Sequence, residues 1–279
     1  MDRPRPAPAA RLAGRRPPDR GFALLIVLWT IVLLALLATR IAASGRSEMQ
    51  LAANLRNAAV AEAAADAAVY ETAYYLSDVG RQQWGLEGAH HIALPQASVD
   101  FRVEDLAGRI NVNTAWPELL AALLAGLGAP PGQAASLAAA IVDWRSPGAG
   151  ASPHGAKAAE YAAAGRAYAP PGSAFREPDE LGSVLGMTPA LLALMLPHVT
   201  VWGESDPDPA CAGPVVRSAL AAVGIRASGR RAEPEWLTVA VTAEAAGPEG
   251  ARFVRSAVVQ VALAAGGEPW RILAWAGGP

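Results

Sequence analysis

The stretch from Gly21 to Thr39 reads Gly-Phe-Ala-Leu-Leu-Ile-Val-Leu-Trp-Thr-Ile-Val-Leu-Leu-Ala-Leu-Leu-Ala-Thr and contains no charged residue. Beyond Arg40 the apolar run continues from Ile41 to Ala43. At about 1.5 Å per residue, a helix over residues 22–43 spans roughly 30 Å, which is the thickness of the hydrocarbon core of a membrane. The sequence therefore predicts a transmembrane helix, followed by about 235 residues that suffice for one large or two small folded domains.

Charge is distributed unevenly about this helix. The first 21 residues carry six arginines and two acids, whereas the rest of the chain carries 17 basic and 23 acidic residues. The excess of arginine before the helix favours a cytoplasmic amino end, with the bulk of the chain on the other side of the membrane. The acidic remainder offers no general basic surface for nucleic acid. The single cysteine, Cys211, excludes a disulfide within the chain.

The junction between the basic stretch and the apolar run is abrupt. The basic residues end at Arg20-Gly21 and the apolar run starts at Phe22, whereas a secretory signal peptide places small residues after a shorter apolar core. An uncleaved signal anchor is one interpretation. The arrangement also resembles a type IV prepilin leader, which implies cleavage between Gly21 and Phe22 by a membrane-embedded aspartyl peptidase and N-methylation of Phe22. The fifth mature position, where most pilins have glutamate, is Ile26.

Beyond the membrane the helical pattern continues. No proline occurs between Gly21 and Pro95 and good helix formers dominate, so one helix from Phe22 to about residue 76, some 80 Å long, is predicted. The small side chains of its outer half suit close packing in a filament and against the folded part of the chain. A solvent-exposed coiled stalk is the alternative, which the lack of leucine heptads disfavours. Residues 77–96 are predicted to form a loop in which the histidine pair at 90–91 lies at the surface.

The rest of the chain alternates between strand and helix patterns. Residues 97–104 alternate as a half-buried strand, and residues 236–244, 251–264 and 270–275 predict a three-stranded meander. Between them, helices are expected near residues 116–126, 132–145, 156–164 and 214–223. Thr114 and Thr188 are candidate N-caps, each followed by a proline. The predicted fold is α+β: a long N-terminal transmembrane helix packed on a pilin-like antiparallel sheet, with a large all-α insertion resembling helix-hairpin-helix units.

The expected domain boundaries follow from these patterns. In chain order they are a basic leader (1–21), the transmembrane part (22–43) and periplasmic part (44–78) of the first helix, the first part of the β domain (79–105), the α-helical insertion (106–203), a linker with one helix (204–235) and the C-terminal β meander (236–279).

The helical insertion raises one alternative function. Residues 113–145 and 175–201 look like helix-hairpin-helix units, which in other proteins often grip DNA phosphates. No basic residue lies between Arg109 and Arg145, and none follows the second hairpin before Arg217, so the cations for phosphate contacts are missing. We therefore interpret these helices as a packing or partner-recognition module. A membrane-anchored, competence-like DNA-binding protein is the alternative.

Catalytic signatures are absent from the sequence. There is no Gly-x-Ser-x-Gly, phosphate-binding loop, His-Glu-x-x-His or cysteine-rich metal signature. The sequence thus predicts that the chain is not an enzyme, and a membrane-anchored periplasmic hydrolase lacks a recognisable site.

A family resemblance extends over nearly the whole chain after the leader. Together with Ile26 in place of glutamate, several segments resemble minor pseudopilin K of the type II secretion system in order and spacing: Phe22–Ala43, Arg109–Ala115, Ile141–Arg145, Glu160-Tyr161, Phe175–Pro197 and Arg271–Trp275. The resemblance implies an inner-membrane, single-pass subunit with a periplasmic C-terminal domain. It implies a place at the tip of the pseudopilus, where such subunits help to initiate assembly for export of folded proteins across the outer membrane. The implied partners are minor pseudopilins I and J, the major pseudopilin, the prepilin peptidase and the inner-membrane assembly platform.

The same resemblance raises the question of calcium, the one cofactor considered. Some members bind calcium in loops of the helical insertion, near Asp-Trp and Glu-Tyr pairs that Asp143 and Glu160 match here. Ser146 and Lys157 stand where acids are common in relatives. Because calcium takes six to eight oxygen ligands, Asp143 and Glu160 would form only part of a site. For each, a helix cap or a solvated carboxylate is the alternative.

Overall fold

The computed structural model describes residues 20–77, 88–203, 206–225, 235–263 and 269–278. The chain divides into two compact units, Met1–Leu55 and Arg56–Pro279. One helix, α1 (Arg20–Ser77), runs through the boundary. Its Phe22–Ile41 segment has a mean hydropathy of 2.8 and is long and apolar enough to cross a membrane. Of the predicted leader (residues 1–21), residues 1–19 lie outside the described residues, and Arg20 and Gly21 begin α1.

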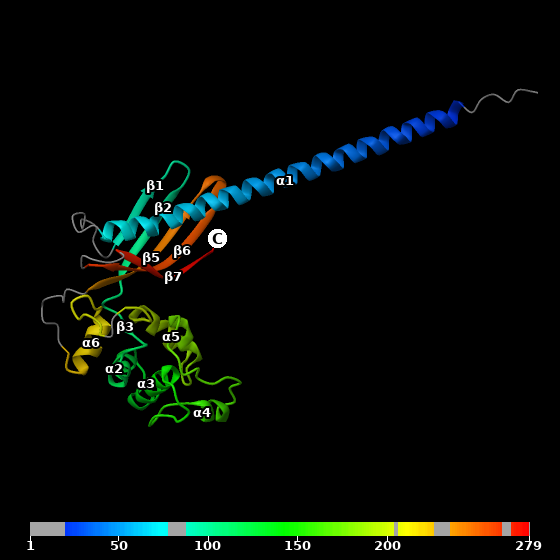
Figure 1. The fold of residues 1–279 in the computed structure, drawn as a ribbon. Helices are drawn as coiled ribbons and strands as arrows, with labels where there is room; N and C mark the ends of the chain where they lie inside the picture. Colours follow the sequence, from blue (N-terminus) through cyan, green and yellow to red (C-terminus); the bar gives the residue numbers. More distant parts are fainter. Residues whose placement is uncertain (1–19, 78–87, 204–205, 226–234, 264–268, 279) are drawn as a thin grey trace, which may run out of the picture. The chain divides into compact units, whose positions relative to one another are not determined.

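The second unit contains a five-stranded antiparallel sheet in the order β1-β2-β5-β6-β7 (Figure 1). Its strands are β1 (Gly88–Ala93), β2 (Ser98–Asp105), β5 (Trp236–Ala246), β6 (Arg252–Ala262) and β7 (Trp270–Gly278). The three C-terminal strands form the meander that the sequence predicts. Strand β2 pairs with β5 although the whole helical block lies between them in sequence, so the predicted α insertion within one sheet is confirmed.

One face of this sheet packs on the later part of α1 (Figure 1). The helix contributes a stripe of small residues to the shared core: Ala61, Ala64, Ala65, Ala68, Val69 and Ala73. The sheet contributes alternate residues of its strands, for example Val99, Phe101 and Val103 of β2. Helix and sheet approach closely at the β5–β6 turn, where a Cβ on Gly247 would lie 3.1 Å from the Cβ of Ala61. Alanine and glycine therefore set the spacing of these two layers.

The helical block has its own core. Its elements are α2 (Pro117–Gly126), α3 (Pro131–Arg145), α4 (Ala158–Ala163), the 3-10 helix η2 (Pro178–Ser183), α5 (Pro189–Met195), η3 (Leu196–His198) and α6 (Pro214–Ala222). Fully buried leucines on α2 and α3 pack with Tyr161, Met195 and Leu220. A short parallel pair, β3 (Ile110–Asn111) with β4 (Val199–Thr200), joins the two ends of the block. Thr188 caps α5 as predicted, because its hydroxyl accepts a hydrogen bond from the Leu191 amide.

Two local predictions are wrong. Part of the predicted loop 77–96 is strand β1, which has weak strand propensity and is held by pairing with β2. There His91 lies opposite Asp100, with Nδ1 2.8 Å from the carboxylate, and His90 stacks on Phe101. Thr114 is not the cap of α2: the N-cap is Trp116, and the Thr114 amide instead donates to Asn111 O in the preceding turn.

Parts of two further predictions lie outside the described residues. They are residues 204–205 and 226–234 of the predicted linker, and residues 264–268, which include the predicted turn between the last two strands.

Candidate functional site

The apolar segment of α1 is the first candidate site. The Gly21–Phe22 peptide bond lies within the helix, one residue after its start at Arg20. Phe22 is 67% exposed and Ile26 50% exposed, and none of the Phe22–Ile41 segment is buried within the structure. A continuous apolar surface of this length needs lipid or other helices around it.

The Asn-Val-Asn segment ties three distant parts of the helical block together. The Asn113 amide nitrogen donates to Phe175 O (2.9 Å) and Val201 O (3.3 Å), while its oxygen accepts from Phe175 N (2.7 Å). Asn111 donates to Gly203 O and accepts from Asn113 N. The side-chain amides of Asn111 and Asn113 therefore link this segment to the backbone near Phe175 and near Val201 to Gly203. They can do so because a side-chain amide both donates and accepts hydrogen bonds.

Arg145, at the end of α3, holds the same segment from the other side. Its guanidinium donates to Val112 O and to Ala115 O, the latter at 2.5 Å. Burial lowers the pKa of Arg145 from its ordinary value, although a guanidinium stays protonated at neutral pH. Arg145 thus acts as a structural donor, and the sequence between Arg109 and Arg145 gives the α2–α3 hairpin no cation for phosphate.

The two acidic residues matched to a calcium site each bind a backbone amide. Asp143 Oδ2 accepts from Ser152 N at 2.9 Å, and Glu160 Oε2 accepts from Lys157 N at 2.8 Å. The second bond satisfies the N-cap amide at the start of α4 and lowers the pKa of the Glu160 carboxyl. Between these carboxylates in sequence, the Lys157 ammonium donates to Asp143 O and Ser146 O, both at 2.5 Å.

The aromatic partners of these acids form a buried cluster. Trp144 stacks on Phe175 at 5.9 Å between ring centroids, and Tyr161 packs against Trp144 at 6.1 Å. The Tyr161 hydroxyl accepts from Leu185 N at 2.8 Å, and burial raises the pKa of this phenol. In each pair, the acidic residue (Asp143 or Glu160) binds a backbone amide, and the aromatic residue that follows it (Trp144 or Tyr161) is buried in the core.

The arrangement around Asp143 and Glu160 offers few of the six to eight oxygen ligands that calcium takes. The described residues contain no group of three or more histidine, cysteine or acidic side chains that could hold a metal. The carbonyls of Asp143 and Ser146 already accept from Lys157, whose positive charge opposes a divalent cation at the same place. Calcium binding by Asp143 and Glu160 stays a prediction.

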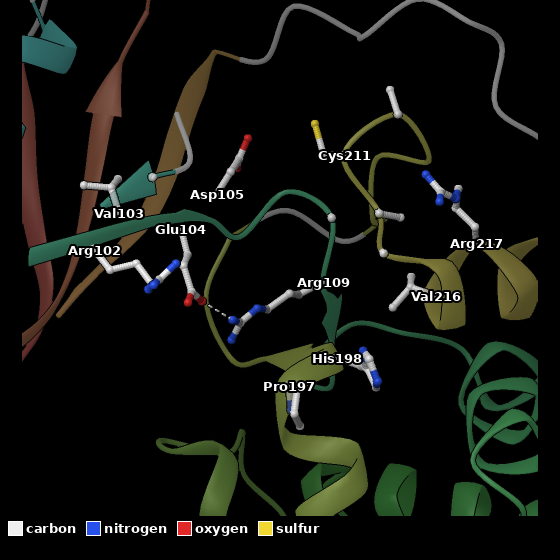
Figure 2. Close-up of a pocket in the computed structure, with 15 residues that line it drawn as sticks. Arg102, Val103, Glu104, Asp105, Arg109, Pro197, His198, Cys211, Val216 and Arg217 are labelled. Atoms are coloured by element: carbon white, nitrogen blue, oxygen red, sulfur yellow. Dashed lines mark hydrogen bonds and ion pairs between the residues drawn. The ribbon is translucent and has the colours of Figure 1, made fainter. Parts of the chain in front are cut away.

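A polar cavity of about 490 Å³ lies where β2 leads into the helical block (Figure 2). Figure 2 shows Arg102, Arg109, His198 and Arg217 around it, with the Arg109 guanidinium paired to the Glu104 carboxylate. Burial lowers the pKa of His198, and the charge of Arg109 acts in the same direction.

The lowered pKa of His198 predicts that the stability of the fold depends on pH. The folded pKa of His198 lies below the ordinary 6.5, so the unfolded chain binds the proton more readily and stability falls as the pH drops below about 6.5. We expect the melting temperature of the full-length protein to fall less between pH 7.5 and 5.5 in His198→Gln than in the wild type. Equal slopes in a pH series of thermal unfolding would contradict this prediction.

Sequence reasoning missed three of these roles. The network of Asn111 and Asn113 depends on residues 62 to 92 positions away in the sequence. The contacts of Lys157 depend on the course of the loop after α3. The signal that was available is compositional: Lys157 is the one lysine in a chain with 22 arginines.

Comparison with known proteins agrees with this fold. Residues 100–204 match the family model described as type II secretion system (T2SS), protein K. The structure resembles a chain in the crystal structure of the GspK-GspI-GspJ complex from the enterotoxigenic Escherichia coli Type 2 Secretion System, with a TM-score of 0.61. Sequence identity is 14%, and the match covers 84% of this chain and 99% of that chain. No curated protein matches the sequence.

These two matches bear out the α+β fold predicted from the sequence. They also bear out the resemblance to minor pseudopilin K, because the family model covers the segment that contains Arg109–Ala115, Asp143-Trp144 and Glu160-Tyr161. Residues 100–204 are therefore similar to protein K of the type II secretion system, and the chain shares the fold of the solved chain from the GspK-GspI-GspJ complex.

Proposed function

We propose that this chain is a minor pseudopilin that assembles with minor pseudopilins I and J at the tip of the type II secretion pseudopilus and helps to start its assembly. The partners are those of the complex in which the similar solved chain was crystallised. In this role the protein is a structural subunit of the machinery that exports folded proteins across the outer membrane. It performs no reaction of its own.

The observation that carries the proposal is that α1 has an unburied apolar segment and a later segment packed on the sheet. Its Phe22–Ile41 segment is apolar and unburied, whereas from Ala61 onward one face of the same helix is buried against the sheet. A helix of this kind can lie in a membrane before assembly and pack among other helices in a filament afterwards. The chain is then a single-pass inner-membrane protein with its folded part in the periplasm, and it contacts the major pseudopilin and the assembly platform.

Ile26 supports a terminal place in the filament. An intramembrane carboxylate costs roughly 3 kcal/mol on insertion and is kept where it has a partner. With isoleucine, 50% exposed in α1, the subunit has no carboxylate at this position with which to bind the amino terminus of a neighbour. A subunit with no neighbour beyond it does not need that contact.

Processing of the leader is tested by mass spectrometry of the amino terminus. In cells with an active prepilin peptidase we expect a chain that begins at N-methylated Phe22, and in cells without the peptidase a chain that keeps residues 2–21. Gly21→Leu should abolish cleavage, whereas Gly14→Leu, a matched change within the leader, should leave it intact. A chain that begins at Met1 or Asp2 despite active peptidase would exclude the pseudopilin role.

Assembly is tested by co-expression with minor pseudopilins I and J of the same secretion system. We expect the three proteins to co-purify in detergent as one complex, and secretion to fail when this chain is deleted. If the chain purified alone while I and J formed a complex without it, the proposed tip role would be wrong.

A further inference from the structure

The only lysine of the chain is buried at the end of a helix. Lys157 is 5% exposed. The other 22 residues among the lysines and arginines of the chain are all arginine. The Lys157 ammonium lies 2.5 Å from Asp143 O and 2.5 Å from Ser146 O, at the C-terminal end of α3. A side chain that usually lies at the surface is thus enclosed here with two carbonyl oxygens.

The end of α3 provides the reason for a cation. The last carbonyls of a helix have no partner within it, and they carry the negative end of the helix dipole. Asp143 O is one of these last carbonyls, and Ser146 O follows just beyond the helix. A compact ammonium with three donors can serve two converging carbonyls, whereas the planar guanidinium of arginine is larger and has a fixed fork geometry. The choice of lysine in an arginine-rich chain therefore has a local physical cause.

The surrounding loop is arranged closely about this contact. A Cβ on Gly155 would lie 2.0 Å from Asp143 Oδ2, so a larger residue there would force the Asp143 carboxylate to move. The Asp143 carboxylate receives Ser152 N, and the Lys157 backbone amide donates to Glu160. Lys157 is thus held at both its backbone amide and its ammonium.

We infer that the Lys157 ammonium is the internal cation of this loop, so that the loop between α3 and α4 is held in place without a divalent metal. The carbonyl oxygens of Asp143 and Ser146 already accept hydrogen bonds from a covalently attached positive charge, and the Asp143 carboxylate accepts from Ser152 N. The inference concerns the stability of the helical block and does not depend on the proposed place of the protein in the pseudopilus.

Calcium dependence of the full-length protein in detergent gives the first test. Thermal unfolding, followed by tryptophan fluorescence, is measured with excess EGTA and with 1 mM calcium chloride. We expect the same melting temperature in both, because the cation position is already filled. A rise in melting temperature with calcium would overturn the inference, because a ligand that binds only the folded state stabilises it.

Removal of the ammonium gives the second test. Lys157→Met keeps most of the apolar stem and leaves the two carbonyls without their donor, so we expect the melting temperature to fall by about 5 °C. Arg166→Met, which removes an exposed positive charge in the same region, is the matched control and should have little effect. If both variants had the melting temperature of the wild type, the ammonium would have no structural role.

A third measurement needs no variant. Because Lys157 is the one lysine, acylation of its amine by a lysine-directed reagent can be followed by mass spectrometry at a single peptide. We expect Lys157 to react in the native protein at least tenfold more slowly than after denaturation. Equal rates in the two states would show an accessible amine and would overturn the inference even if Lys157→Met failed to fold.

Discussion

Replacing Arg255 by methionine is expected to lower the free energy of unfolding of the second unit by about 2–4 kcal/mol. The Arg255 side chain, 7% exposed on β6, donates to Asp66 at 2.6 Å and to Glu62 at 3.0 Å on α1. Its guanidinium also lies 4.8 Å from the Phe253 ring centroid and 4.6 Å from that of Trp275. Loss of one guanidinium thus removes the charged contacts between helix and sheet together with aromatic packing. Because Glu62 is about half exposed, its share is screened by water.

The matched control for this change is Arg252→Met. Arg252 lies on the same strand but is exposed, so its loss should alter stability by less than about 0.5 kcal/mol. Chemical denaturation of the full-length chain in detergent measures both. If the two variants were equally stable, the ion pairs of Arg255 would not contribute to holding α1 on the sheet.

Replacing Asn113 by alanine is expected to destabilise the helical block by about 2–4 kcal/mol. The change leaves Phe175 N without its acceptor, and Phe175 O and Val201 O without a donor. Each of these backbone groups then loses a hydrogen bond inside the fold, where water replaces it poorly. Because Phe175 stacks on Trp144, the tryptophan emission of the folded protein should change as well.

Two further variants separate the causes of this effect. Asn113→Asp keeps an oxygen that can accept from Phe175 N but loses both donated bonds, so its stability should lie between that of the wild type and Asn113→Ala. Gln133→Ala, on the exposed side of α3, should be close to wild type and controls for loss of an amide in general. Equal stability of Asn113→Ala and Gln133→Ala would exclude the bridging role of Asn113.

The regular elements with strong patterns could be predicted from the sequence. The length of α1 follows from its composition and the lack of proline, and the alternation of β2, β5 and β6 follows from burial of one face. Strand β1 could not be predicted in this way, because its residues form a strand only through pairing with β2. Neither could the short β3–β4 pair, since two residues per strand give no period to detect.

The candidate sites show the same division. The exposed apolar segment and its junction at Gly21–Phe22 are local features, so the sequence suffices to propose them. The interpretation of Asp143 and Glu160 as possible ligands came from a family pattern, whereas their partners Ser152 N and Lys157 N are set by the course of the loop. Long-range partners such as those of Asn113 and Arg255 need the tertiary structure, because nothing in the local sequence specifies them.

The insertion of the helical block between paired strands has a consequence for the order of folding. Ser98 of β2 pairs with Ala246 of β5, so this part of the sheet must close a loop of well over a hundred residues. The contacts of the helical block lie within that loop and close at shorter separations, which favours earlier formation. Because the chain is synthesised from its amino end, the stripe of small residues on α1 is made before β5 and β6, which complete the sheet that covers it. We expect this interval to be the period in which the nascent protein most needs a chaperone or a partner subunit to cover that stripe.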